Sequence, residues 1–307
     1  MRARALNAIA SAPPASFFVG SAVFHYLGPA FAVLLFARLE PTGVAWLRIA
    51  SAAVVFSVWR KPWRAFAALD RDGRRTVVAM GAVLAVMNVC FYLAIDRLPL
   101  GTVAAIEFLP VIVLAAIGTR TSRNAAAVAL AVLGVYLLAN VALVDEPLGI
   151  ALAFANAGLF AAYIVLGHRV AQQSGFGGID GLGAAMLVAL VVAVPLGGWN
   201  ALPAFVDPVA LGAGIGVGIA SSVIPYVCDQ LAMARLARAT YALLVSLLPA
   251  TATIIGAIVL AQFPSWVDAA GIALVIAGIA LHKERENQAL HDPNVEPPNR
   301  CSQLQGS

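Results

Sequence analysis

The chain has 307 residues, of which 62% are hydrophobic and only 11% carry a charge. Those values exclude an ordinary soluble domain, in which about a quarter of the residues are charged. The net charge of +4 is spread over short polar segments, which argues against a nucleic-acid-binding surface. A lipid bilayer is therefore the expected solvent for most of the chain.

Nearly all of the length falls in apolar runs of roughly twenty residues, each long enough to cross about 30 Å of hydrocarbon as a helix. The runs lack the alternating pattern of barrel strands, and backbone polar groups in lipid must bond internally, so the sequence predicts an all-α integral membrane protein. Ten transmembrane helices are expected, near 17–36, 42–59, 76–95, 101–119, 124–142, 148–167, 182–199, 209–228, 239–261 and 266–282.

Charge in the connecting segments predicts the orientation of these helices. If the amino terminus is cytoplasmic, sixteen of the 19 Lys and Arg residues lie on the inner side, and only Arg38 and Arg97 lie in outer loops. The outer loops then hold Glu40, Asp96, Asp145, Glu146, Asp207 and Asp268. This asymmetry follows the positive-inside rule, so both termini are expected in the cytoplasm.

A weak internal repeat divides the chain into two halves. Residues Tyr92–Pro110 align with Gln230–Ala250 through shared LA, RL and LP pairs. Because each unit holds five helices, the second copy must be inverted, an arrangement that secondary transporters use around a central site. The predicted units are residues 17–142 and 148–282, joined by the turn Val144–Gly149. Residues 1–16 form a cytoplasmic N-terminal segment, and the polar tail 283–307 is expected to be disordered in the cytoplasm.

Glu107 is the only acidic residue deep inside a run, and an ionised carboxylate in lipid costs at least a few kcal/mol. It is therefore expected to face the bundle interior, as a proton-coupling group or a partner for a substrate ammonium. A structural hydrogen bond to another helix is the alternative. Arg48 lies roughly 9 Å deep in the second run. It can hold a substrate carboxylate or pair with Glu107, but its side chain is also long enough to reach the outer headgroups.

Other polar groups at depth complete the set of candidate substrate- or proton-binding residues. They are His25, Asn88, Asn156, Tyr163 and Ser246. Many such residues only hydrogen-bond between helices. Pro110 and Pro249 occupy matching repeat positions and are candidate hinges, although proline in membrane helices can also serve packing alone.

The three cysteines, Cys90, Cys228 and Cys301, match neither a disulfide framework nor a metal site. No nucleophile with a base, and no nucleotide-binding motif, is apparent. We therefore expect no catalytic residues, no metal, no cofactor and no enzymatic activity, with energy supplied by an ion or substrate gradient. Whether the chain forms a homodimer is left open.

The segment MNVCFYLAIDRLPLGTVAAIEFLP, Met87–Pro110, resembles the bacterial threonine and homoserine exporters in the EamA branch of the drug/metabolite transporter superfamily. The resemblance extends over essentially all ten runs. It includes KPWR at Lys61–Arg64, AWLRIA at Ala45–Ala50, LAVLGVYLL at Leu130–Leu138 and SSVIPY at Ser221–Tyr226.

The resemblance implies a bacterial inner-membrane exporter of small amino acids or related metabolites, coupled to protons. Within it, Glu107, Arg48 and Asn88 match the family's own polar positions. The second half departs from the family pattern: SMEPA is replaced by Ser246–Ala250, and GE by Ala261 and Gln262, so two acidic positions are lost. Efflux of drugs or other metabolites is the alternative function. An intramembrane enzyme and a non-transporting scaffold are further alternatives.

Overall fold

The computed structural model describes residues 14–118, 121–171, 178–233 and 247–281. Within these ranges every regular element is a helix and no strand occurs, which confirms the all-α prediction for this part of the chain. The first half holds α2 (Pro14–Leu35), α3 (Pro41–Arg60), α4 (Pro62–Ala68), α5 (Arg71–Ile95), α6 (Leu100–Gly118) and α7 (Ser122–Asp145). The second half holds α8 (Pro147–Ala171), α9 (Gly178–Ala193), η1 (Val194–Gly198), η2 (Trp199–Val206), α10 (Pro208–Gly218), η3 (Ile219–Val223), α11 (Ile224–Met233), α13 (Leu248–Leu260) and α14 (Trp266–Leu281).

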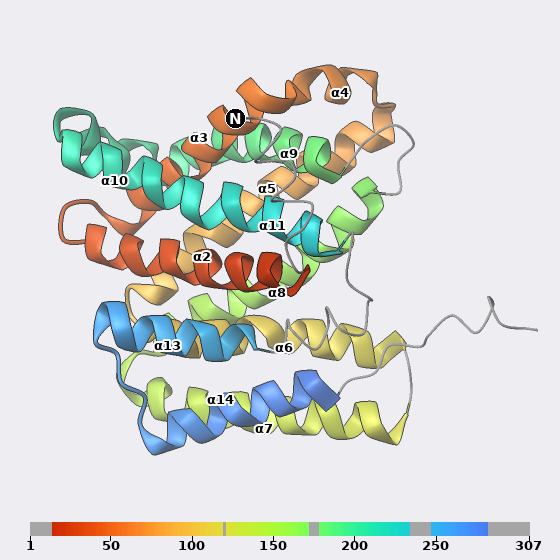
Figure 1. The fold of residues 1–307 in the computed structure, drawn as a ribbon, viewed down its shortest axis with the longest axis vertical. Helices are drawn as coiled ribbons and strands as arrows, with labels where there is room; N and C mark the ends of the chain where they lie inside the picture. The colour runs from red at the N-terminus through yellow and green to blue at the C-terminus, as the bar shows by residue number, and fades with distance from the viewer. Residues whose placement is uncertain (1–13, 119–120, 172–177, 234–246, 282–307) are drawn as a thin grey trace, which may run out of the picture.

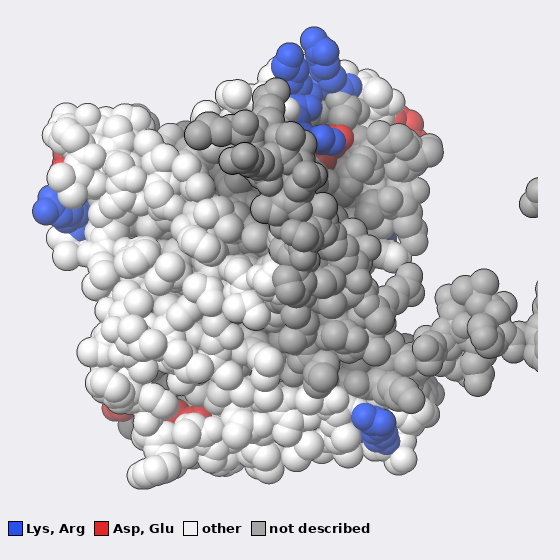
Figure 2. All heavy atoms as spheres, in the orientation of Figure 1, with Lys and Arg blue, Asp and Glu red and all other residues white. Residues whose placement is uncertain are grey.

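Six of the described helical segments are long and apolar enough to cross a membrane. They are Ser16–Leu35, Pro41–Arg60, Arg71–Ile95, Pro147–Val170, Ile179–Val206 and Pro208–Cys228. Four shorter apolar helices lie beside them, at Leu100–Pro110, Ser122–Leu138, Leu248–Leu260 and Trp266–Leu281. On the face drawn in Figure 2, the coloured charged side chains gather near helix ends, and the described surface between them is uncharged. Such a surface suits contact with lipid.

The connection between the second and third predicted runs is itself largely helical. The chain forms the short helix α4 and then starts α5 at Arg71, five residues before the predicted run begins. Proline at the first position of α4 fits a helix start, because its missing N–H is not needed there. Asp70 caps α5 by accepting a hydrogen bond from the Gly73 N–H at 2.8 Å. Local capping therefore extends this helix beyond its apolar run.

The two halves of the chain pack against each other along the whole bundle. Figure 1 shows α11 beside α2, α13 beside α6 and α14 beside α7, and each of these pairs is in contact. α5 packs on α8 and α9, and α3 packs on α9, η1 and η2. The hydrophobic core consequently lies mostly between helices that are distant in sequence, and a site at its centre receives residues from both halves.

Glycines allow α2 and α3 to approach the π-helical segment η3 closely. A Cβ at Gly28 of α2 would collide with the Ser221 side chain, and a Cβ at Gly218 would collide with the Ser51 hydroxyl and lie 2.8 Å from the Arg48 carbonyl oxygen. Small residues at such contacts let helices pack backbone to backbone. These two glycines therefore set the distance between the halves at the level of Ser221.

Replacing Gly218 by Ala is expected to destabilise the folded protein by about 1–3 kcal/mol, the usual cost of overpacking a tight core. Gly216→Ala is the matched control, because a Cβ there has no neighbour within 4 Å. Thermal unfolding in detergent should show a lower midpoint for the first variant only. Equal midpoints for the two variants would contradict the tight contact at Gly218.

Candidate functional site

Glu107 lies inside the bundle, as its depth in the sequence predicts. It is 7% exposed, on a stretch of α6 in which every residue from 101 to 108 is buried. The side-chain amide Nδ2 of Asn156, from α8, donates a hydrogen bond to Glu107 Oε1 at 3.0 Å. Asn156 is fully buried, and its Oδ1 has no hydrogen-bond partner in the structure. The contact joins the two halves at the only acidic side chain buried among the described residues.

Arg48 also points into the bundle rather than toward the outer surface, and is 9% exposed. Its Nε donates to the Ser222 hydroxyl at 3.0 Å, and its Nη2 donates to the Ser221 carbonyl oxygen at 3.3 Å. The guanidinium carbon lies 5.6 Å from the centre of the Tyr92 ring, a cation–π distance. Arg48 is close enough to Glu107 for their charges to interact, although they form no ion pair.

The local sequence explains why the Ser221 carbonyl is free to accept from Arg48. In a regular α-helix this carbonyl would bond the N–H of residue 225, but Pro225 has none. The chain adopts a π-helical turn at Ile219–Val223 directly before that proline. π-Helical turns in α-helices are frequently found at functional sites, where they expose backbone groups. Pro225 and η3 together supply a backbone acceptor at membrane depth.

Several buried polar atoms around Glu107 and Arg48 have no hydrogen-bond partner in the structure. They include the Tyr26 hydroxyl and Asn156 Oδ1, while the Tyr92 and Ser221 hydroxyls lie beside each other. Tyr26 interacts electrostatically with Glu107, and the Tyr92 hydroxyl lies beside Arg48 and Ser221. Buried polar groups are almost always satisfied, so unpaired ones in one region point to a ligand or to water. We name Glu107, Asn156, Arg48, Tyr26, Tyr92, Ser221 and Ser222 the central polar cluster.

The remaining candidate residues have different surroundings. His25 is half-buried on α2, with its ring packed edge-on against Tyr26 at 5.2 Å between centroids. Asn88 is buried and donates to the Leu84 carbonyl of its own helix at 2.8 Å. Tyr163 is half-buried on α8 and stacks on Phe160. Ser246 lies outside the described residues. None of these contacts joins His25, Asn88 or Tyr163 directly to Glu107.

The two candidate hinge prolines differ in their local positions. Pro110 lies inside α6, where it removes the N–H that would bond the Ile106 carbonyl. Pro249 stands in the first turn of α13, a position at which proline is compatible with an unbroken helix. Matching repeat positions therefore do not give matching helix geometry.

Gln262 occupies the position where the resembled family carries an acid. Its Oε1 accepts a hydrogen bond from the Leu100 N–H at 3.0 Å, at the first turn of α6. Ala261, just before it, has a positive φ of 54° and ends α13. Gln262 thus caps the helix that carries Glu107, from the opposite half of the chain.

Sequence reasoning missed four members of the central polar cluster: Tyr26, Tyr92, Ser221 and Ser222. The SSVIPY motif was noted, but its serines were not singled out. A serine four residues before a proline in an apolar run indicates a free carbonyl, and that pattern could have identified Ser221.

Ion pairs join the two halves at opposite ends of α3. Arg38 lies 2.8 Å from Asp207, which also caps α10 through the N–H groups of Val209 and Ala210. Arg60 and Asp180 form two parallel hydrogen bonds of 2.8 and 3.0 Å. Paired arginine–carboxylate bonds of this kind fix geometry as well as charge. These contacts hold α3 against the second half near both membrane surfaces.

The backbone N–H of Ala210 and the Arg38 side chain lower the pKa of Asp207 below its ordinary value. A lowered pKa stabilises the fold above the unfolded-state value and loses that effect as the pH falls through the folded-state value. Asp207→Asn keeps a good helix cap but removes the charge. We expect wild type to unfold at a higher temperature than this variant at pH 7, with the gap closing below the ordinary aspartate pKa of about 3.9. A gap that persists unchanged at pH 3 would exclude this charge as its source.

Comparison with known proteins agrees with this geometry. Residues 147–282 match the model of the EamA-like transporter family. The threonine/homoserine exporter RhtA of Salmonella typhimurium is 31% identical over 268 residues, covering 85% of this chain and 89% of the relative. RhtA of Escherichia coli K12 is 31% identical over 254 residues, covering 81% and 84%. One crystal structure aligns with a TM-score of 0.54 at 18% identity, covering 87% of this chain and 97% of its own, which supports the fold alone.

An all-helical bundle with several membrane-spanning helices and a buried, charged centre defines a multi-pass membrane protein with a polar site inside the bilayer. The chain belongs to the EamA-type transporters of the drug/metabolite transporter superfamily, and resembles the RhtA exporters over most of its length. The predicted family is confirmed.

Proposed function

We propose that the chain exports small amino acids or related metabolites, of the threonine and homoserine type, across a bacterial inner membrane. The observation that carries this proposal is the central polar cluster, in which a carboxylate and a guanidinium from different helices are buried near each other without forming an ion pair. An amino acid is a zwitterion with complementary charges. Arg48 would hold its carboxylate and Glu107 its ammonium group, with the hydroxyls of Tyr26, Tyr92 and Ser221 as further polar groups beside them.

The proposed architecture is ten transmembrane helices in two inverted five-helix repeats, with both termini in the cytoplasm. Six long and four shorter apolar helices support the count. The interleaving of the halves supports a site between them. Alternating access would then open the central polar cluster to one side at a time, with Pro110 and Pro249 as hinges. His25, Asn88, Tyr163 and Ser246 are kept as neighbouring candidates.

Proton coupling would act through Glu107. A protonated Glu107 has no negative charge to hold a substrate ammonium group, so proton binding and substrate binding would exclude each other. Such competition exchanges protons for substrate without ATP. The related proteins are named as exporters, which supports transport rather than catalysis.

The test is flux of labelled threonine and homoserine in proteoliposomes with an imposed pH difference. We expect saturable amino-acid movement that protein-free vesicles lack and that follows the proton gradient. A cationic dye serves as the second cargo. Movement of the dye without amino-acid flux would overturn the proposed substrate class and favour drug efflux within the same family. Absence of flux for every tested solute would favour a non-transporting role.

A further inference from the structure

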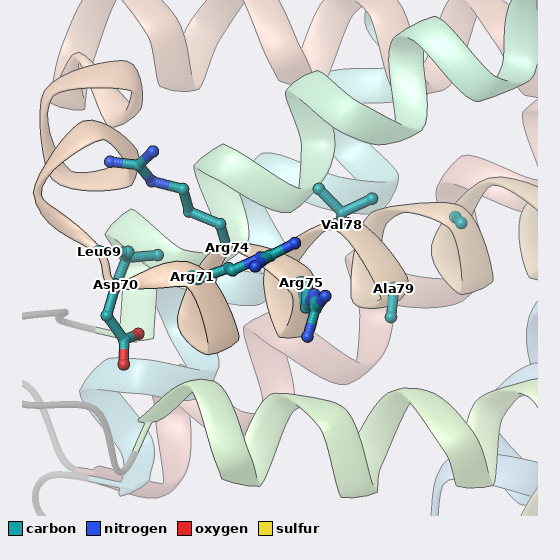
Figure 3. A pocket seen from close by; sticks show the side chains of 8 residues that line it. Leu69, Asp70, Arg71, Arg74, Arg75, Val78 and Ala79 are labelled. Atoms are coloured by element: carbon teal, nitrogen blue, oxygen red, sulfur yellow. The ribbon is translucent and has the colours of Figure 1, made fainter.

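A surface furrow lies at the start of α5, away from the central polar cluster. It is an open depression of about 890 Å³, lined by Leu69, Asp70, Arg71, Arg74, Arg75, Val78, Ala79 and Ala82. Figure 3 shows the three arginines on the first turns of α5, with Val78 and Ala79 further along the same helix. Figure 2 shows a group of basic side chains at the end of the bundle where Figure 1 places α4, which precedes α5 in the chain. We call this feature the α5 furrow.

Helical spacing places the α5 side chains of this furrow on one stripe. Their positions follow the intervals of three and four residues that share a helix face: Arg71, Arg74, Arg75, Val78, Ala79 and Ala82. From Arg75 to Ala82 the stripe advances about 10 Å along the helix axis. It therefore begins with three arginines and continues along the outer face of α5 as a shallow apolar surface, because Val78 and Ala79 are exposed and two of the last three side chains are only methyl groups.

The acidic neighbours offset part of this charge: Arg71, Arg74 and Arg75 with Asp70 and Asp72 leave a formal net charge of +1. Asp70 lines the furrow and caps α5, and Asp72 forms a highly exposed ion pair with Arg75 at 3.5 Å. Arg74 donates to the Ala67 carbonyl oxygen at 2.6 Å, which holds its guanidinium toward α4 without a charge partner. Arg71 has no ion pair within the described ranges. The entrance of the furrow therefore carries an excess of positive charge at partly fixed positions.

The adjoining helix α4 places this entrance at the level of the lipid headgroups. Trp63 on α4 is about half exposed, and Lys61 and Arg64 flank it. Tryptophan is enriched at membrane interfaces, where its ring and N–H meet both environments. With α4 at the interface, the apolar end of the α5 furrow extends into the hydrocarbon of the same leaflet.

We propose that the α5 furrow binds one anionic phospholipid from the leaflet on the arginine-rich side of the protein. The phosphate sits among Arg71, Arg74 and Arg75, and an acyl chain lies along Val78, Ala79 and Ala82. A phosphate with no compensating cation complements the net positive charge of the entrance, where Arg71 and Arg74 have no ion pair among the described residues, whereas phosphatidylcholine carries its own trimethylammonium group. The positive-inside rule requires charge on this side of the membrane. It does not require three arginines on one helix face ahead of small apolar residues.

Native mass spectrometry of the detergent-solubilised full chain, with phosphatidylglycerol or phosphatidylcholine added, tests the site. We expect one tightly retained phosphatidylglycerol, and no comparable retention of phosphatidylcholine. The variant with Arg71→Gln, Arg74→Gln and Arg75→Gln should lose phosphatidylglycerol affinity by about fivefold for each arginine, the usual weight of a basic side chain near an anionic membrane surface.

A matched variant removes the same charge from the same side but outside the furrow: Lys61→Gln, Arg64→Gln and Arg169→Gln. It should retain the lipid, and an equal loss in both variants would overturn the site in favour of diffuse surface charge. Ala82→Leu keeps the arginines and fills the apolar end, so it should lower lipid retention. If it leaves phosphatidylglycerol binding unchanged, or if inorganic phosphate displaces the lipid readily, the acyl chain is not held in the furrow. Size-exclusion profiles identify any variant that fails to fold.

Discussion

Glu107→Gln is expected to abolish both pH-driven accumulation and exchange of threonine, because the neutral amide, like a protonated Glu107, has no charge to hold the substrate ammonium group. Glutamine keeps the size of the side chain and can still bond Asn156, whose amide donates to Oε1 at 3.0 Å in the wild type. It cannot exchange a proton. With one proton exchanged per substrate, a pH difference of one unit can drive roughly tenfold accumulation, since about 1.4 kcal/mol corresponds to a factor of ten.

The measurement compares net uptake with counterflow in the same proteoliposomes. Wild type should accumulate label along the proton gradient and exchange it in counterflow, whereas the Gln variant should show neither above the level of protein-free vesicles. Asn156→Leu is a useful companion, because it removes the partner of Glu107 but keeps the titrating carboxylate. Accumulation by the Glu107→Gln protein at the wild-type ratio would assign coupling to another group.

Arg48→Ala is expected to remove amino-acid transport by weakening substrate binding. Arg48 is buried and is held by two hydrogen bonds and the Tyr92 ring. Removing one partner of a buried charge pair typically costs about 2–5 kcal/mol, or at least roughly thirtyfold in affinity. Arg48→Lys keeps the positive charge but loses the planar guanidinium with its paired N–H donors, so the loss of substrate affinity is expected to be smaller than in Arg48→Ala.

A matched variant separates substrate binding from fold support. Ser222→Ala removes the hydroxyl that accepts from Arg48 Nε but leaves the guanidinium in the cluster. It should weaken transport far less than Arg48→Ala. If the two variants are equally impaired, or if Arg48→Ala also stops movement of a cationic dye, Arg48 acts by holding α3 against η3 rather than by binding a carboxylate.

The sequence predicts the position of some site residues but not of others. Glu107 can be identified from the sequence alone, since a single carboxylate in an apolar run is expected to face the interior of the helix bundle, where the structure places it. Arg48 cannot, because a side chain of its length can reach either the core or the headgroups. Its direction is decided by Ser222 and the free Ser221 carbonyl, which lie 174 and 173 residues away in the chain.

The sequence likewise predicts some helix ends correctly and misses others. The apolar runs predicted the start of α14 at residue 266, but they missed α4 and placed the start of α5 five residues late. Hydropathy detects the part of a helix that lies in lipid, whereas caps such as Asp70 extend helices into water. The basic face that forms the α5 furrow lies on that extension.

The sequence by itself determined that most of the chain lies in lipid, that it is all-helical, which family it belongs to and that Glu107 is buried. Hydropathy, charge and motifs are properties of single segments, so they can be read without the tertiary structure. Only the tertiary structure decided that Asn156 meets Glu107, that Arg48 turns inward onto η3, and that Gly28 and Gly218 bring the halves into contact. Those relations depend on the rotation and separation of helices distant in the chain. Most of these helices are apolar on all sides, so hydrophobicity alone does not specify their rotation. Close packing and a few buried hydrogen bonds specify it instead.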